Sequence, residues 1–158
     1  MKAMKPTQYF ALAIGIFFLL IGIMGFIPGL VKDPMLTAEE VGLGFSNGYG
    51  DLLGLFPVNV LHNVVHVVVG LLGIFASFSL DSSRLYSGGF AIAYGLIAVA
   101  GLIPGFNTTL GLMPIFGNNV WLNALTAAIA AYFGFFVKPD LLEVAGAQKE
   151  YTGLTGKK

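Results

Sequence analysis

Cysteine is absent from this chain of 158 residues, and charged residues are scarce. Without a thiol the chain has no disulfide, no thiolate metal site and no cysteine nucleophile. Charged residues make up 10% and hydrophobic residues 56%, whereas ordinary soluble domains are about 25% charged. So few charges could not cover the surface of a soluble domain, so the composition favours a membrane protein. The net charge of zero gives no electrostatic basis for binding nucleic acid.

Four segments contain no Asp, Glu, Lys or Arg and are long enough to cross a bilayer: about 9–27, 57–78, 85–103 and 119–137. A membrane helix needs about 20 mostly apolar residues, and helix is the state that satisfies the backbone in lipid. Lys2 and Lys5 precede the first segment as in a signal peptide, but the run is longer than a usual signal core. It also lacks a small-x-small cleavage site, so we expect it to be retained.

The basic residues predict the orientation. Only Lys32 lies between the first two segments, whereas seven basic residues share the other side: Lys2, Lys5, Arg84, Lys138, Lys149, Lys157 and Lys158. The positive-inside rule therefore places both termini in the cytoplasm. The long link at about 30–56 carries four acidic residues and belongs on the outer side. There it could meet a partner or a cation, although a solvated loop is the simpler interpretation.

Local signals predict where the elements begin and end. Thr37-Ala38-Glu39-Glu40 fits a capping box and predicts a short surface helix in the long link. Pro57 suits the first helical position of the second span, and Asp81, Ser82 or Ser83 could cap the third. Pro139 should stop the fourth helix, leaving residues 138–158 as a polar cytoplasmic tail.

Two motifs occur twice along the chain. Gly25-Phe26-Ile27-Pro28-Gly29 returns as Gly101-Leu102-Ile103-Pro104-Gly105, and Leu53-Gly54-Leu55-Phe56-Pro57 returns as Leu110-Gly111-Leu112-Met113-Pro114. This indicates an internal duplication. We expect an all-α fold, a four-helix transmembrane bundle built from two parallel two-helix repeats. Residues 1–158 would form a single integral membrane domain, with repeat 1 at about 9–78 and repeat 2 at about 85–137. Two spans per repeat imply a pseudo-twofold axis along the membrane normal.

Small residues punctuate the predicted spans and should supply the packing faces between helices. They are Gly15, Gly22, Gly25, Gly88, Gly89, Gly95, Gly101, Ala124, Ala127, Ala128, Ala131 and Gly134.

The second span carries a polar stripe. Asn59, His62, Asn63 and His66 stand at i, i+3, i+4 and i+7, which is one face of a helix. The second repeat aligns Asn119 with Asn59, Asn123 with Asn63, and Thr126 with His66, while Leu122 replaces His62. Such a stripe should point into the bundle.

Several interpretations of the stripe compete. Hydrogen bonding between helices, involving Asn59, Asn119 and Thr126, is the simplest. The alternative is a haem or chlorophyll held by His62 and His66, with Asn63 and Asn123 beside them; a bis-histidine haem would need a second chain. Zinc would need three or four ligands, so no metal site is predicted. No buried acid or base continues a proton path from these histidines. The spans also lack the groups of an enzyme active site, so no catalytic residue is predicted.

The run Leu53-Gly54-Leu55-Phe56-Pro57-Val58-Asn59-Val60-Leu61-His62-Asn63-Val64-Val65-His66, with residues 10–29, 84–86 and 119–122, resembles a family of small four-span bacterial membrane proteins catalogued as a domain of unknown function. The resemblance implies an inner-membrane protein with four helices and supplies no activity. Relatives often carry histidine where this chain has Asn123, which weakens the case for a symmetric histidine pair here.

We therefore expect a small non-enzymatic membrane protein, accessory or structural, in the bacterial inner membrane, or in the thylakoid of a photosynthetic host. Its partners would be the lipid bilayer and either another membrane protein or a second copy, bound through the small-residue faces. A pigment- or haem-binding bundle is the alternative, and a small transporter comes third.

Overall fold

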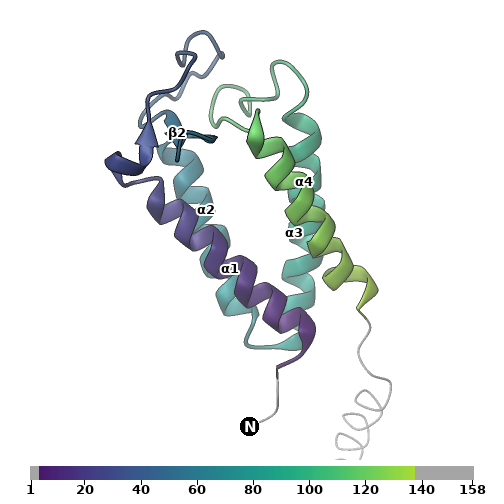
Figure 1. Ribbon diagram of the computed structural model, residues 1–158. Helices are drawn as coiled ribbons and strands as arrows, with labels where there is room; N and C mark the ends of the chain where they lie inside the picture. Colours follow the sequence, from purple (N-terminus) through teal and green to yellow (C-terminus); the bar gives the residue numbers. More distant parts are fainter. Residues whose placement is uncertain (1–3, 138–158) are drawn as a thin grey trace, which may run out of the picture.

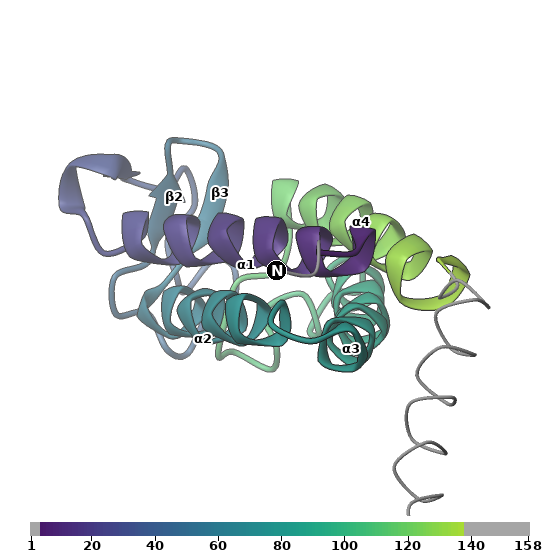
Figure 2. The same cartoon turned by 90° about the horizontal axis from the view of Figure 1, so that it is seen from below.

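The computed structural model describes residues 4–137, and this part of the chain is mostly helical. Its four α-helices are α1 (Pro6–Met24), α2 (Val60–Ala76), α3 (Leu80–Ala100) and α4 (Asn118–Ala131), and a π-helical turn, η2 (Tyr132–Phe136), continues α4. Figure 1 shows α1 beside α2 and α3 beside α4, and Figure 2, seen from below, shows the same two pairs. The predicted tail and Pro139 lie outside the described residues.

Two of the described helical stretches, Pro6–Met24 and Asn118–Phe136, are long and apolar enough to span a membrane. Helix α2 is apolar but shorter, and α3 includes Asp81 and Arg84 in its first turns. All four helices overlap the predicted spans, with boundaries that differ by up to six residues.

Close glycine contacts join α1 to α2. A Cβ added at Gly15 would lie 2.7 Å from the backbone nitrogen of Ile74, and one at Gly22 would lie 2.8 Å from that of Val67. Gly73 is equally tight, at 2.8 Å from the Cα of Gly15. Real Cβ atoms do not approach backbone this closely, so glycine is what allows the two backbones to pack.

The second pair uses fewer of its glycines. Gly134 in η2 packs on Gly88 of α3, with an added Cβ 2.6 Å from the Gly88 nitrogen. At Gly89, in contrast, no atom of the described residues lies within 4 Å of an added Cβ. The predicted packing role is therefore met at Gly88 and Gly134 and, within residues 4–137, not at Gly89.

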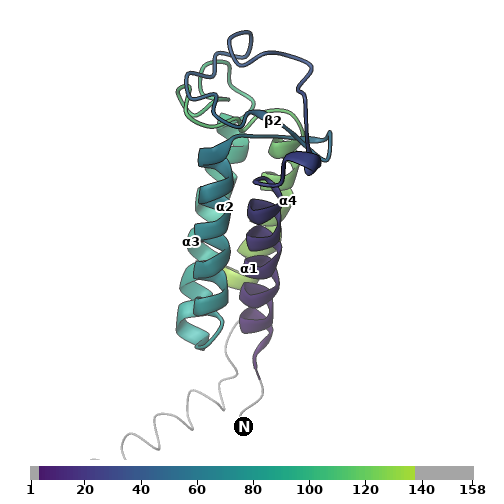
Figure 3. The ribbon, with the colours of Figure 1, turned by 90° about the vertical axis from the view of Figure 1, so that its left-hand side faces the viewer.

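The prediction of a purely helical fold was wrong in the long link. A small antiparallel sheet forms there from β1 (Val31–Lys32), β2 (Gly50–Leu52) and β3 (Phe56–Val58), in the order β1-β2-β3. A 3₁₀ turn, η1 (Pro28–Leu30), leads into it. Figure 3 shows the sheet and the loops gathered at one end of the bundle, opposite the amino terminus.

Pro57 lies in β3, opposite Asp51, and is not the first helical residue as predicted. Helix α2 begins three residues later, because Asn59 caps it: the Asn59 side-chain oxygen accepts a hydrogen bond from the His62 backbone N–H at 2.9 Å. Helix α3, in contrast, begins earlier than the predicted caps imply, because Ser79 caps it: the Ser79 hydroxyl accepts from the Ser82 backbone N–H at 3.1 Å.

The capping box at Thr37 forms without a helix behind it. The Glu40 carboxylate accepts from the Thr37 backbone N–H and hydroxyl at 2.7 and 2.9 Å, and these two donors lower the pKa of the Glu40 carboxyl. Residues 38–42 form only turns. Gly42 has a φ of +73°, which a helix cannot continue, so the predicted surface helix is absent from this segment.

The repeated motifs adopt matching backbone conformations. Leu53 and Gly54 have φ of 55° and 71°, and their counterparts Leu110 and Gly111 have 56° and 88°. Left-handed backbone is uncommon for leucine, so its occurrence at both matched positions is a specific likeness. Helices α1 and α3 also end alike, each with a glycine C-cap in right-handed conformation, Gly25 and Gly101.

Candidate functional site

Polar side chains gather inside the bundle near its loop end. Seven of them are buried, each at most 6% exposed, and together they form what we call the Asn–His cluster: Asn59, His62, Asn63, His66, Asn119, Asn123 and Thr126. These are the residues that the sequence pattern singled out. Six of them fall into three environments, and Thr126 bonds within its own helix.

The first environment joins the two halves of the chain. The Asn59 side-chain amide donates to the carbonyl of Leu112 at 2.8 Å, and to that of Phe45 at 2.8 Å. The matched Asn119 donates to the carbonyl of Pro57 at 2.6 Å and to that of Pro114 at 3.1 Å. Each asparagine thus reaches the copy of the Leu-Gly-Leu-x-Pro motif that belongs to the other half.

The second environment lies between α1 and α2. The Asn63 amide donates to the carbonyl of Gly25 at 2.8 Å, and its side chain occupies the space where a Cβ of Gly25 would stand. The Asn63 side-chain oxygen has no hydrogen-bond partner among the described residues.

Thr126 bonds within its own helix, where its hydroxyl lies 2.8 Å from the Leu122 carbonyl.

The third environment contains the two histidines. Their ring centroids are 4.3 Å apart, and His66 also packs edge-on against Phe18, whose ring in turn meets Tyr94 at 5.0 Å. The Nδ1 atoms of both histidines are buried and have no hydrogen-bond partner within the described part of the chain.

The backbone carbonyls of Pro57 and Pro114 also adjoin the His62 imidazole. These are the same two carbonyls that accept hydrogen bonds from the Asn119 side chain.

A cavity of about 30 Å³ adjoins the histidines. It is lined by His62, Val65, His66, Tyr94, Ile97, Met113, Ile115 and Asn123. A single water needs about 10–15 Å³ measured in this way, so the cavity suits one or two waters or one small ion. It is far too small for the tetrapyrrole of a haem or chlorophyll.

The sequence pattern located the cluster and missed its surroundings. Tyr94 and Met113 line the cavity, but neither follows the polar period that identified the stripe. The Pro57 and Pro114 carbonyls are backbone groups, so no side-chain pattern could indicate them; their place in the repeated motif was the one available signal.

Comparison with known proteins adds a family. The sequence profile of the family described as Domain of unknown function (DUF4383) matches residues 8–136. The chain belongs to the DUF4383 family. No curated protein matches it, and neither does any solved structure. The matched range covers all four helices except the first two residues of α1. It includes the whole Asn–His cluster, so this cluster lies within the DUF4383 domain.

Proposed function

We propose that this chain is a non-enzymatic integral membrane protein that crosses the bilayer four times. The proposal rests on where the polar and apolar side chains lie, which is the reverse of the arrangement in a soluble protein. Large apolar side chains are exposed on every helix, whereas the Asn–His cluster is buried. In lipid this arrangement is favourable, because apolar side chains face hydrocarbon and polar ones pair inside the bundle.

Helix α3 shows this best, because its composition alone does not mark it as a span. Its exposed side chains include Leu85, Ile92, Leu96 and Val99, while Ser83 and Ser87 are completely buried. An apolar exterior on all four helices supports four crossings rather than two.

The excess of basic residues supports an orientation with both termini in the cytoplasm. The α2–α3 connection then lies inside, with the sheet and the α3–α4 loop outside. The matching motif conformations and the paired packing of α1 with α2 and α3 with α4 support an origin by duplication, with a pseudo-twofold axis along the membrane normal.

Single cysteines test this topology, because the native chain provides no background thiol. We expect a membrane-impermeant maleimide to label Met35→Cys and Phe106→Cys in intact spheroplasts. We expect it to label Asp81→Cys only after permeabilisation. All three positions are exposed. Equal labelling of the cysteines at 35 and 81 in intact spheroplasts would show that α2 does not cross, and the pair at 81 and 106 tests α3 in the same way.

We propose further that the protein works by association, as an accessory or structural component, with another membrane protein or with a second copy. Within the described residues, most glycines of α1 and α2 are used between those two helices. Gly89 and Ala93 of α3 remain exposed, four residues apart. Small residues at this spacing allow close approach of another membrane helix.

Light scattering in a mild detergent tests this role. We expect a protein mass well above the 16.7 kDa of one chain, and a return toward the single-chain mass in Ala93→Leu. Ile92→Leu is the matched control. Ile92 is next to Ala93 in the sequence and is also exposed, and replacing isoleucine by leucine leaves the side-chain volume unchanged. A single-chain mass for the native protein with no copurifying polypeptide would contradict association.

A further inference from the structure

The buried histidine pair brings two ring nitrogens without a described hydrogen-bond partner beside one small cavity. His62 and His66 are 5% and 4% exposed, and neither Nδ1 has a partner among the described residues. A buried imidazole nitrogen without a partner is costly. The backbone carbonyls of Pro57 and Pro114 adjoin the His62 ring, and carbonyls beside a ring nitrogen are among the groups that orient histidines at metal centres.

Met113 supplies a third donor to the same cavity. Its thioether is soft and polarisable, and together with imidazole it favours Cu(I) over harder ions. None of the described residues that line this cavity is a carboxylate, so none of them would neutralise a divalent charge. The cost of burying an ion rises steeply with its charge, so neutral ligands in this setting favour a monovalent ion.

The cavity size and the ring spacing suit one ion. About 30 Å³ leaves room for a bare metal ion and little else. Ring centroids 4.3 Å apart are compatible with one ion bound by a nitrogen of each ring at the usual distance of about 2.0–2.1 Å.

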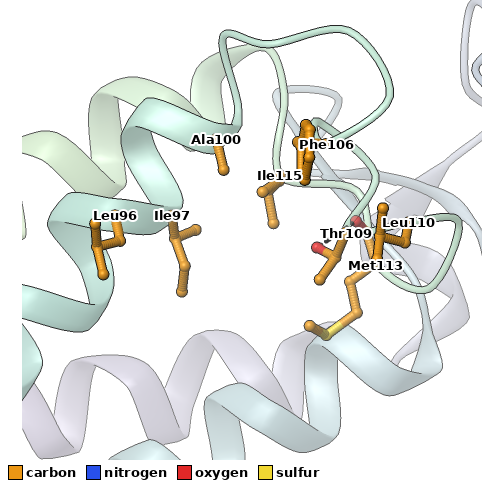
Figure 4. A pocket seen from close by; sticks show the side chains of 8 residues that line it. All are labelled: Leu96, Ile97, Ala100, Phe106, Thr109, Leu110, Met113 and Ile115. Atoms are coloured by element: carbon orange, nitrogen blue, oxygen red, sulfur yellow. Dashed lines mark hydrogen bonds between the residues drawn. The ribbon is translucent and has the colours of Figure 1, made fainter.

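A groove at the surface shares lining residues with this cavity. An apolar groove of about 290 Å³ lies along α3 and the loop that follows it, and it shares Ile97, Met113 and Ile115 with the histidine cavity. Figure 4 shows Met113 among the groove-lining residues, with its sulfur extending from the loop toward the neighbouring helices. Met113 therefore stands between the outer groove and the histidines, where its side chain could let an ion pass.

We propose that His62, His66 and Met113 form a binding site for one Cu(I) ion. The site would hold the ion by two imidazole nitrogens and one thioether sulfur, and the groove of Figure 4 would admit it. This goes beyond the association role proposed above and does not depend on it.

A competition titration tests the site. The full chain in detergent is titrated anaerobically, with ascorbate present, against the Cu(I) complex of bicinchoninate. We expect the protein to remove one equivalent of Cu(I) per chain. Loss of an outer-shell partner alone lowers metal affinity by about 10–100-fold, so loss of a ligand in Met113→Leu or His66→Gln should cost at least about tenfold.

Met35→Leu is the control, because Met35 is 98% exposed in the long link and should leave the affinity unchanged. Met113→Leu conserves volume and should fold; its thermal unfolding is checked first. X-ray absorption of the loaded native chain should show two nitrogen ligands and one sulfur ligand. Failure to take Cu(I) from the chelator overturns the proposal. So does uptake that Met113→Leu leaves unchanged, or a copper spectrum without sulfur.

Discussion

At the scale of single residues, two neighbouring asparagines in α4 have very different surroundings. Asn119 is 2% exposed and donates to two buried carbonyls, those of Pro57 and Pro114. Asn118 makes one exposed hydrogen bond, to the Leu55 carbonyl at 3.0 Å. Burial therefore makes the same amide important at one position and dispensable at the next.

We predict that Asn119→Ala lowers the free energy of unfolding by about 1–3 kcal/mol, because it leaves buried carbonyls without a donor. Asn118→Ala should cost less than about 1 kcal/mol, since water or lipid headgroups can replace its bond. Thermal unfolding in detergent, followed by circular dichroism, measures both. Equal shifts in Tm would mean that the Asn119 bonds do not stabilise the fold.

At the scale of helices, the α1–α2 pair depends on the absence of side chains at its contact. A Cβ at Gly73 would lie 2.8 Å from the Gly15 Cα and from the Tyr86 hydroxyl. We predict that Gly73→Ala destabilises the protein by about 1–3 kcal/mol, because the two helices must move apart.

Gly89→Ala is the matched control within a helix. An added Cβ there meets no described atom within 4 Å, and alanine favours helix over glycine by up to about 1 kcal/mol. Its stability should therefore stay equal or rise. The same unfolding assay compares the two variants, and a Gly73→Ala protein as stable as Gly89→Ala would contradict tight packing between α1 and α2.

Helices were predictable from the sequence to a greater extent than their ends and connections. The four segments without charged residues located all four helices, because a helix with an apolar surface along most of its length has few positions for a charged side chain. Pro57 was misassigned because its missing N–H suits an edge strand as well as a helix start. Thr37 and Glu40 formed their predicted hydrogen bonds, but the glycine at 42 prevented a helix from following.

The candidate site was predictable in its members and not in their partners. The spacing of Asn59, His62, Asn63 and His66 indicated one polar face, and all four are buried. Their partners are mostly backbone carbonyls of distant loops, such as those of Gly25 and Leu112. Such partners depend on the tertiary path of the chain and carry no signal in side-chain identity.

At the scale of the whole molecule, the two halves are joined at opposite ends by different means. At the loop end, Asn59 and Asn119 each donate to the other half, as described above. At the other end, Phe10 of α1 stacks on Phe133 of η2 with centroids 4.7 Å apart, and the Thr7 hydroxyl donates to the Phe133 carbonyl at 3.4 Å. The reciprocal asparagines should therefore act together as one connection.

A double-mutant cycle tests that cooperation. Removing either asparagine should loosen the contact that both stabilise, so Asn59→Ala and Asn119→Ala together should cost less than the sum of the single changes. We predict a coupling of about 0.5–1 kcal/mol, within the range seen for residues that share one hydrogen-bond network. Thr7→Val with Asn119→Ala is the control pair. Thr7 is in the first turn of α1 and Asn119 in the first turn of α4, and these two helix starts lie at opposite ends of the bundle (Figure 1), so the effects should add. Strict additivity for the two asparagines would show that each stabilises its own loop alone, and that the halves are held together by packing between the helices.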